Sequence, residues 1–373
     1  MTLNDEINPF CYAPWVQLYA RSSSMNKPKN KKDTEFSPCC EWQGKPLQFD
    51  IEKRDKSFYW QHIKKAMIKK DMSMLSKTCG ECIECEEREQ KSTRLYIKEC
   101  VEREDNPWIP NEINQIDFRP SNLCNMRCGM CNPENSSLLA KEFGETVYHF
   151  DSKNIYDLDL SNLKKIKILG GEPSIQSEVY EFLEYFLKTY NNRPNLHFTT
   201  NMTNVNKRWL GIIDKFDEVD ISMSIDGAGK IFEYLRPPGK WHIIEQNIKS
   251  MQEYQHVSLR LKFHVTIGLV AMLTIDDWLP YFLNNKLPAE FYPVQGIAGG
   301  ELTCIPKIYL RPITRYLQKI NHPYADEILR MIQNIGEYNP VHLNSFKDMT
   351  NDRDILLKRD VKLLSARLYK LLT

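Results

Sequence analysis

The sequence has no excess of charge of either sign and no apolar run long enough to cross a membrane. Its 50 lysines and arginines nearly balance its 49 aspartates and glutamates, and a net charge of +1 gives no general attraction to nucleic acid or anionic lipid. No stretch approaches the roughly 20 apolar residues of a membrane-spanning helix. The first nine residues are polar and acidic, unlike a secretion signal. We therefore expect a cytoplasmic protein with neither a membrane nor a nucleic-acid partner.

Cysteine is almost absent after residue 131. Ten of the 11 cysteines lie within the first 131 residues, and only Cys304 lies beyond them. An odd number of cysteines in a long chain does not suit a disulfide scaffold. Clustered thiols in a reducing compartment are typical metal ligands, so the pattern indicates bound iron or zinc.

Strands and helices alternate from residue 113 onward. We expect strands at 115–119, 165–169, 196–200, 218–224, 258–267 and 289–294. Helical patterns lie between them near 133–143, 176–190, 207–215, 241–255 and 275–284. Strands separated by helices favour an α/β fold with a parallel sheet, either open or curled into a barrel.

The two ends of the chain differ from this core. Residues 1–112 are cysteine-rich and charged, and we expect them to be irregular apart from an amphipathic helix at 58–74. After Pro312 the pattern is helical, at 314–320, 324–335 and 353–372. We therefore predict an N-terminal domain at 1–112, a core at 113–312 and a helical extension at 313–373.

Three cysteines follow the first predicted core strand. Cys124, Cys128 and Cys131 form a C-x3-C-x2-C triplet in a loop that leads to a helix. Closed iron–sulfur sites use four cysteines, so three thiolates around a 4Fe–4S cluster would leave one iron open to another ligand. A zinc site completed by a histidine is the alternative, although no histidine lies near the triplet.

The triplet resembles the signature of the radical S-adenosylmethionine (SAM) superfamily, and later motifs support the resemblance in the same order. Gly170, Gly171, Glu172 and Pro173 match the family's GGEP turn after the second strand. The resemblance implies that this turn and the Glu172 carboxylate hold the amino group of SAM. A glycine pair allows the backbone to approach a ligand closely, and a carboxylate suits an ammonium group.

Further motifs lie at the ends of the third and fourth strands. Thr199-Thr200-Asn201 resembles the family's T-N-G, with Met202 in place of glycine, and Ser222-Met-Ser224-Ile-Asp-Gly resembles its S-I-D-G. The resemblance implies SAM contacts from Asn201, Ser222, Ser224 and Arg236, with Ser224 and Arg236 at the carboxylate and the ribose. A surface salt bridge is the alternative role for Arg236. Met130 stands where the family usually has an aromatic residue beside the adenine.

The resemblance covers roughly residues 113–310 and implies a partial (β/α)6 barrel, with the site at the carboxyl ends of the strands. It also implies the reaction. An external donor such as flavodoxin or ferredoxin reduces the cluster, SAM is cleaved, and the resulting 5′-deoxyadenosyl radical takes a hydrogen atom from a substrate.

The N-terminal cysteines are similar to those of twitch-type radical SAM proteins, which hold an auxiliary iron–sulfur cluster in a SPASM-like element. The resemblance favours Cys11, Cys39, Cys82 and Cys85 as ligands, with Cys40 and Cys79 as alternates, from an alignment that uses Glu89 and Arg94. A zinc ribbon with the same ligands is the alternative. Cys100 is most simply a spare buried thiol.

Cys304 follows the last predicted core strand. A lone cysteine is most often a small buried apolar residue, and the sharper hypothesis is a hydrogen-atom donor to a substrate radical. Relatives with auxiliary elements often modify peptides, so we expect a peptide substrate. A small metabolite or nucleotide is the alternative within the enzyme class, and a non-catalytic iron–sulfur electron carrier is the alternative outside it.

Overall fold

The computed structural model describes residues 10–22, 34–39, 41–42, 58–87, 92–145, 153–296 and 300–373. The chain divides into two compact units, each built from several segments. Unit 1 comprises Met1–Asn122, Thr146–Phe198 and Lys207–Val219, and unit 2 comprises Leu123–Glu145, Thr199–Asn206 and Asp220–Thr373. The predicted boundaries at 112 and 312 therefore stay a prediction.

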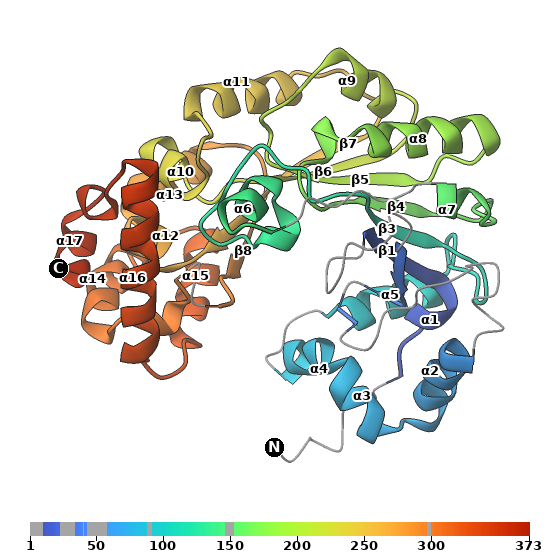
Figure 1. Cartoon of the computed structure of the whole chain (residues 1–373), viewed down its shortest axis with the longest axis horizontal. Helices are drawn as coiled ribbons and strands as arrows, with labels where there is room; N and C mark the ends of the chain where they lie inside the picture. The colour runs from blue at the N-terminus through green and yellow to red at the C-terminus, as the bar shows by residue number, and fades with distance from the viewer. Residues whose placement is uncertain are drawn as a thin grey trace. The chain divides into compact units, whose positions relative to one another are not determined.

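Eight strands form one sheet in the order β2-β1-β3-β4-β5-β6-β7-β8 (Figure 1). The strands are β1 (Gln17–Ser22), β2 (Thr34–Ser37), β3 (Gln115–Arg119), β4 (Lys165–Ile168), β5 (Asn195–Thr200), β6 (Val219–Ser224), β7 (Leu259–Ile267) and β8 (Ala289–Pro293). β2 is antiparallel to β1, while the pairs β1–β3, β3–β4, β4–β5 and β7–β8 are parallel. The mostly parallel sheet confirms the predicted α/β class in its general form.

In the described residues, helices connect the strands, and further helices precede β3 and follow β8. Before β3 lie α1 (Ala13–Val16), α2 (Phe58–Lys69), α3 (Met72–Thr78), α4 (Gly80–Glu87) and α5 (Thr93–Glu102). Between β3 and β8 lie α6 (Ser137–Glu142), α7 (Lys153–Tyr156), α8 (Ser177–Thr189), α9 (Lys207–Ile213), α10 (Gly229–Leu235), α11 (Trp241–Gln252), α12 (Leu269–Leu273) and α13 (Ile275–Asn284). After β8 come α14 (Lys307–Leu317), α15 (Pro323–Gln333), α16 (Pro340–Leu357) and α17 (Ala366–Leu372). Short 3-10 turns are η2 (Pro133–Asn135), η3 (Pro173–Ile175), η5 (Leu302–Cys304) and η6 (Val361–Leu363).

The core strands form where apolar and polar residues alternate in the sequence. In β7 the buried Phe263, Val265 and Ile267 alternate with the polar Lys262 and His264. Successive side chains of a strand point to opposite faces, so β7 has an apolar face in the core and a polar face on the other side. This polar face positions several groups described below.

The N-terminal segment, expected to be irregular, contributes β1 and β2 to the sheet. In β1 the consecutive residues Gln17, Leu18 and Tyr19 are all buried, so the strand lacks the alternation that marks a half-buried strand. The Nε2 of Gln17 lies 3.2 Å from the Oδ2 of Asp117 on the neighbouring β3. This buried polar contact is why a glutamine stands inside the sheet.

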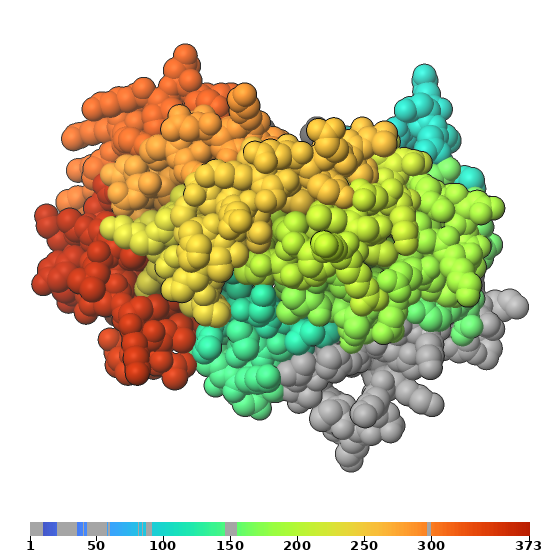
Figure 2. Space-filling view, turned by 90° about the horizontal axis from the view of Figure 1, so that it is seen from above, coloured from blue at the N-terminus to red at the C-terminus, as the bar shows by residue number. Residues whose placement is uncertain are grey.

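The helical ends also differ in detail from expectation. The helix expected at 58–74 is interrupted at Lys70, whose φ of 54° is left-handed, and Asp71 caps α3. The long helix expected at 353–372 is broken at Lys358, with a φ of 53°, where α16 ends. In Figure 2 the last residues, in red, form a continuous part of the visible surface. Among the described residues, none of the helices combines the length and apolar character needed to cross a bilayer.

Candidate functional site

The three core cysteines lie in a segment before α6, residues 123–136, which we call the cysteine loop. Cys128 is buried, whereas Cys124 and Cys131 are partly exposed. The backbone N–H of Cys124 donates to Ser137 Oγ at 3.0 Å, and that hydroxyl lies 3.1 Å from the Cys124 carbonyl oxygen. The hydroxyl of Ser136 donates to the carbonyl of Met126 at 2.6 Å. Two serines that start α6 thus fix the shape of the loop.

The backbone of the cysteine loop also pairs with the segment after α10. The N–H of Arg127 donates to the carbonyl of Pro237 at 2.7 Å, and the N–H of Gly129 donates to the carbonyl of Leu235 at 2.9 Å. These contacts flank Cys128 on both sides. The position of its sulfur is therefore set by backbone hydrogen bonds.

Arg236 places a buried positive charge at the sulfur of Cys128. Its Nη1 lies 3.6 Å from that sulfur, and its Nε donates to Oδ2 of Asp226 at 2.6 Å. The other oxygen of Asp226 accepts the backbone N–H of Thr266 at 2.8 Å. Only 8% of Arg236 and none of Asp226 is exposed, so this ion pair is buried and not a surface salt bridge.

Burial and the nearby opposite charges shift the pKa values of Cys128 and Arg236 in opposite directions. Burial raises the pKa of the Cys128 thiol, while the Arg236 guanidinium lowers it. Burial alone would lower the pKa of Arg236, but the Asp226 carboxylate and the sulfurs of Cys128 and Cys131 raise it above its usual range. Sequence reasoning missed Asp226 as a partner, although it belongs to the motif that was recognised.

Of the expected SAM contacts in unit 2, Asn201 is hydrogen-bonded to the cysteine loop. Asn201 donates to Asn125 of the loop at 2.9 Å, and Asn125 in turn donates to Thr203 at 2.8 Å. Met130 and Cys131 line a cavity of about 50 Å³. The apolar part of that lining comes largely from Leu139, Phe143, Leu235, Val270, Phe346 and Met349.

Met202 has the conformation that explains why glycine is usual at this position. Its φ of 60° is left-handed, a region that glycine adopts without strain. The side chain is fully buried, and Asn247 donates to the Met202 carbonyl at 2.7 Å. Packing and this hydrogen bond therefore hold a backbone shape that the side chain itself disfavours.

The Gly170–Gly171 turn lies in unit 1. Both glycines have left-handed φ values, 80° and 52°. A Cβ on Gly170 would lie only 3.0 Å from the Arg119 side chain, so no larger residue fits without a shift. The glycine pair is thus required by backbone conformation and by close packing.

Glu172 is fully buried and starts the turn η3. Its Oε1 accepts hydrogen bonds from the backbone N–H of Ser174 at 3.1 Å and from the Ser174 hydroxyl at 2.6 Å. Pro173 occupies the first position of η3, where its missing N–H costs nothing. The carboxylate is therefore held in one orientation, as a ligand-binding group requires.

The two serines of the S-I-D-G-like motif lie on β6. Ser222 is buried and Ser224 is half-buried, and their spacing places both on the same face of the strand. Their roles at SAM stay a prediction.

A polar cluster on β7 and β8 was missed by sequence reasoning. Lys262 Nζ lies 2.8 Å from both carboxylate oxygens of Glu290, and the Tyr292 hydroxyl donates to Glu290 at 2.9 Å. The His264 ring stacks on Tyr292 with centroids 4.4 Å apart. Burial lowers the pKa of His264, so the imidazole is neutral at neutral pH. The alternating polar residues of β7 were the available signal.

Cys304 is fully buried at the end of η5. Burial raises the pKa of its thiol to about 11, so it is protonated at neutral pH. Its side chain matches the simple expectation of a small buried residue. A protonated thiol is also the form that a hydrogen-atom donor needs, so that role stays a prediction.

Four N-terminal thiols line one small cavity of unit 1, with a volume of about 20 Å³: those of Cys11, Cys39, Cys79 and Cys82. Cys85, which the structure also describes, is partly exposed and lies outside this lining. Cys40 and Glu89 lie outside the described residues. The structure thus groups the alternate Cys79, rather than Cys85, with the other three.

The same cavity is lined by Arg94, which forms a buried ion pair with Glu86. Burial raises the pKa of Cys11 to about 12 and that of Cys82 to about 11, and Arg94 lowers the pKa of Cys11. The backbone N–H of Ala13 donates to the Cys11 sulfur at 3.4 Å. Deprotonated thiols here would therefore need a metal or a cluster to balance the loss of hydration.

In the described part of the chain, no three His, Cys, Asp or Glu side chains meet around a point where a single metal ion could sit. A cubane cluster takes one thiolate on each of its irons, so its ligands do not have to meet at one point. The three thiol donors and the buried guanidinium at Cys128 have the chemistry that a 4Fe–4S cluster with one open iron would require.

Comparisons with known proteins gave distant structural neighbours and one family match. No curated protein matches the sequence significantly. Native anSMEcpe with bound AdoMet is 16% identical, with 55% of this chain and 59% of that chain covered and a TM-score of 0.41. Streptococcus suis SuiB bound to S-adenosylmethionine is 16% identical, with 57% and 46% covered and a TM-score of 0.37. S. suis SuiB bound to its precursor peptide SuiA is 14% identical, with 80% and 70% covered and a TM-score of 0.39.

The chain spans about half the length of several solved structures that it matches. The match to a family is more specific. Residues 118–280 match the model of the radical SAM superfamily, and this range contains the cysteine loop, the Gly170–Gly171 turn and Arg236. The part of the chain that carries the candidate site is therefore the part that is similar to the radical SAM superfamily.

Proposed function

We propose that this protein is an enzyme that cleaves SAM reductively and removes a hydrogen atom from a substrate. The observation that carries the proposal is the buried guanidinium of Arg236 at the sulfur of Cys128. A buried positive charge favours the thiolate, which is the form that binds iron. When bound, the cluster supplies an electron to the sulfonium of SAM, and the adenosyl radical so released takes the hydrogen atom.

The chain's own residues would bind and orient SAM. Cys124, Cys128 and Cys131 would each hold one iron of the cluster and leave the fourth iron open. The cavity beside Met130 would exclude water from the adenine. The Glu172 carboxylate, already oriented by Ser174, would accept hydrogen bonds from the amino group of SAM.

The test is anaerobic reconstitution with iron and sulfide, followed by SAM and a strong reductant. We expect 5′-deoxyadenosine by mass spectrometry, and we expect Cys128→Ala to abolish it while the N-terminal thiols still bind their share of iron. Formation of 5′-deoxyadenosine by Cys128→Ala at the wild-type rate would refute the proposal. An iron–sulfur electron carrier would bind iron but leave SAM intact, which separates that alternative.

We also propose a second iron–sulfur cluster in the N-terminal segment, with a twitch-like role. The support is the grouping of Cys11, Cys39, Cys79 and Cys82 around one cavity. A zinc ribbon uses the same kind of ligands, and metal analysis after anaerobic purification separates the two. The likeness to twitch-type proteins rests on the N-terminal motif pattern alone.

For the substrate we propose a peptide, modified in the cytoplasm with electrons from a small donor such as flavodoxin or ferredoxin. The support is the auxiliary-cluster pattern of the N-terminal cysteines, together with the hydrogen-bonding groups on the polar face of β7 and β8. A small metabolite or nucleotide is the alternative. Incubating the active enzyme with cell-derived peptide and metabolite fractions, and following which fraction changes in mass, decides between them.

A further inference from the structure

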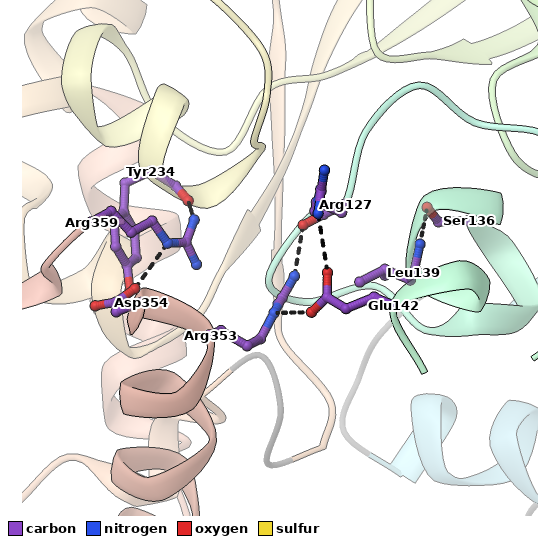
Figure 3. A network of polar contacts seen from close by, with 8 residues as sticks. All are labelled: Arg127, Ser136, Leu139, Glu142, Tyr234, Arg353, Asp354 and Arg359. Carbon is purple, nitrogen blue, oxygen red and sulfur yellow. Dashed lines mark hydrogen bonds and ion pairs between the residues drawn. The ribbon is translucent and has the colours of Figure 1, made fainter. Parts of the chain in front are cut away.

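In the C-terminal extension, Arg353 of helix α16 contacts the cysteine loop (Figure 3). The Nη2 of Arg353 donates to the carbonyl oxygen of Arg127 at 2.9 Å. Arg127 is the residue before Cys128, and its N–H already donates to the carbonyl of Pro237. The backbone N–H and the carbonyl oxygen of Arg127 are therefore both hydrogen-bonded. The carbonyl oxygen is bound by α16, and the N–H is bound by the segment after α10.

A carboxylate fixes the direction of the Arg353 guanidinium. The Nε of Arg353 donates to Oε1 of Glu142, at the end of α6, at 3.2 Å. The other carboxylate oxygen of Glu142 lies 3.7 Å from Nη1 of Arg127. The side chains of Glu142 and Arg353 are only 8% and 15% exposed, so the charges are largely removed from water. In Figure 3 Glu142 lies between the two arginines, and Figure 2 shows the blue-green 123–145 segment adjoining the red C-terminal residues.

A second group of contacts anchors the end of α16 from which Arg353 projects. The buried Asp354 accepts the Tyr234 hydroxyl at 2.9 Å and the Nε of Arg359 at 2.8 Å. Arg359 also donates to the carbonyl of Tyr234 and lies over its ring, 4.1 Å from the centroid. Asp354 further accepts the backbone N–H of Val361 at 2.7 Å. The helix is thus fixed to α10, next to the segment that pairs with the cysteine loop.

We infer that Arg353 is a positioning residue that fixes the backbone of the cysteine loop at Cys128. The inference deepens the proposed function, because it assigns part of the C-terminal extension to the proposed cluster site. The guanidinium reaches the Arg127 carbonyl and the Glu142 carboxylate at once, which requires the planar fork of arginine. A lysine keeps the charge but offers one ammonium group, so it replaces only part of the contact.

Three variants of α16 test this role. Arg353→Met removes the contact, Arg353→Lys keeps the charge, and Lys347→Met removes one positive charge from the same helix at a different cavity. The first measurement is hydrogen–deuterium exchange of the 123–136 backbone in the chain without iron. The second is the rate at which a chelator removes iron from reconstituted protein, compared with the denaturant midpoint of unfolding.

We expect Arg353→Met to speed exchange in the loop and iron release by about tenfold or more, as loss of a charge-assisted hydrogen bond predicts. Arg353→Lys should lie between it and the wild type, and Lys347→Met should match the wild type. Loop exchange in Arg353→Met no faster than in Lys347→Met would overturn the inference, as would a change that only follows the midpoint of global unfolding. If the wild-type chain takes up no iron, the proposed function fails, and the exchange measurement still decides the role of Arg353.

Discussion

Arg236 contacts the sulfur of Cys128 through one nitrogen of its guanidinium and the carboxylate of Asp226 through another, with all three side chains buried. The positive charge beside Cys128, a proposed cluster ligand, is therefore paired with Asp226, which closely follows β6. The same guanidinium serves stability, because without it Asp226 would be a buried carboxylate without a cation. The two roles can be separated experimentally.

The first prediction separates them by substitution. Arg236→Met should lower the free energy of unfolding by about 3–5 kcal/mol, because it leaves an uncompensated buried charge. The double variant Arg236→Met with Asp226→Asn should recover much of that loss, yet both should fail to form 5′-deoxyadenosine. Denaturant titration and a SAM cleavage assay measure the two effects. An unchanged unfolding midpoint in the single variant would contradict the burial argument.

A second prediction concerns Glu172. Glu172→Gln keeps the size of the side chain and its contact with Ser174 but loses the charge, so it should weaken SAM binding by about 1–3 kcal/mol. Ser174→Ala is the comparison: it keeps the charge and the backbone contact but removes the hydroxyl that donates to the carboxylate, so it should weaken SAM binding less than Glu172→Gln does. Isothermal titration of reconstituted protein measures both. Equal SAM affinities of wild type and Glu172→Gln would exclude a contact with the amino group.

The N-terminal thiols give a third prediction. Wild-type protein reconstituted without oxygen should contain about twice the iron of one 4Fe–4S cluster. Cys79→Ala should lose close to half of that iron, whereas Cys85→Ala should keep it, because Cys79 lines the thiol cavity and Cys85 lies outside the lining. Iron and zinc are counted by plasma emission spectroscopy. The opposite ranking of the two variants would restore Cys85 as the ligand.

For Cys304 the two hypotheses predict different products. Loss of one buried sulfur in Cys304→Ala should cost about 1 kcal/mol of unfolding free energy through packing alone. If Cys304 is a hydrogen-atom donor, its loss should also leave SAM cleavage intact, while product formation stops or gives a different product. Product analysis with the identified substrate decides. An unchanged product in the variant would reduce Cys304 to a packing residue.

His264 leads to a prediction about pH. Its pKa lies below the ordinary 6.5 because of burial, opposed by Asp226 and Glu290 and helped by Arg236 and Lys262. Above pH 6.5, the ordinary pKa of histidine, the neutral form of His264 contributes its full stability. That contribution is lost as the pH falls from there through the lower pKa of His264 in the folded protein. His264→Gln should therefore lose less stability than the wild type between about pH 7.5 and about pH 5.5. Denaturant midpoints at the two pH values measure this, and parallel losses would show that another group controls the acid limb.

The core strands could be predicted because their burial follows the sequence pattern. In β7, the alternation of apolar and polar residues correctly predicted the last residue, Ile267. It predicted the first residue to within one position of the observed start. β1 could not be found in this way, because Gln17, Leu18, Tyr19 and Ala20 are buried in succession and the glutamine pairs with a residue of the neighbouring strand. Pairing with β3 is a long-range property that no local pattern of β1 expresses.

The candidate site was predictable only as far as its motifs extend. Cys128 and Arg236 stand in recognisable motifs, and the structure brings them together. Arg353 stands in no motif, and its hydrogen bond to Arg127 joins residues 226 positions apart. Nothing near Arg353 in the sequence distinguishes it from the other charged residues of its helix.

The division into units has a consequence for how such a chain can be altered. The polypeptide passes between the two units five times, at residues 122, 145, 198, 206 and 219. No single crossover in a gene could therefore exchange one whole unit and nothing else for that of a relative, because segments of the two units alternate along the chain. A fragment cut for expression at residue 122 would keep unit 2 whole with only part of unit 1, and one cut at residue 219 would keep unit 1 whole with only part of unit 2. A cut at residue 145, 198 or 206 would leave both units divided between the two fragments.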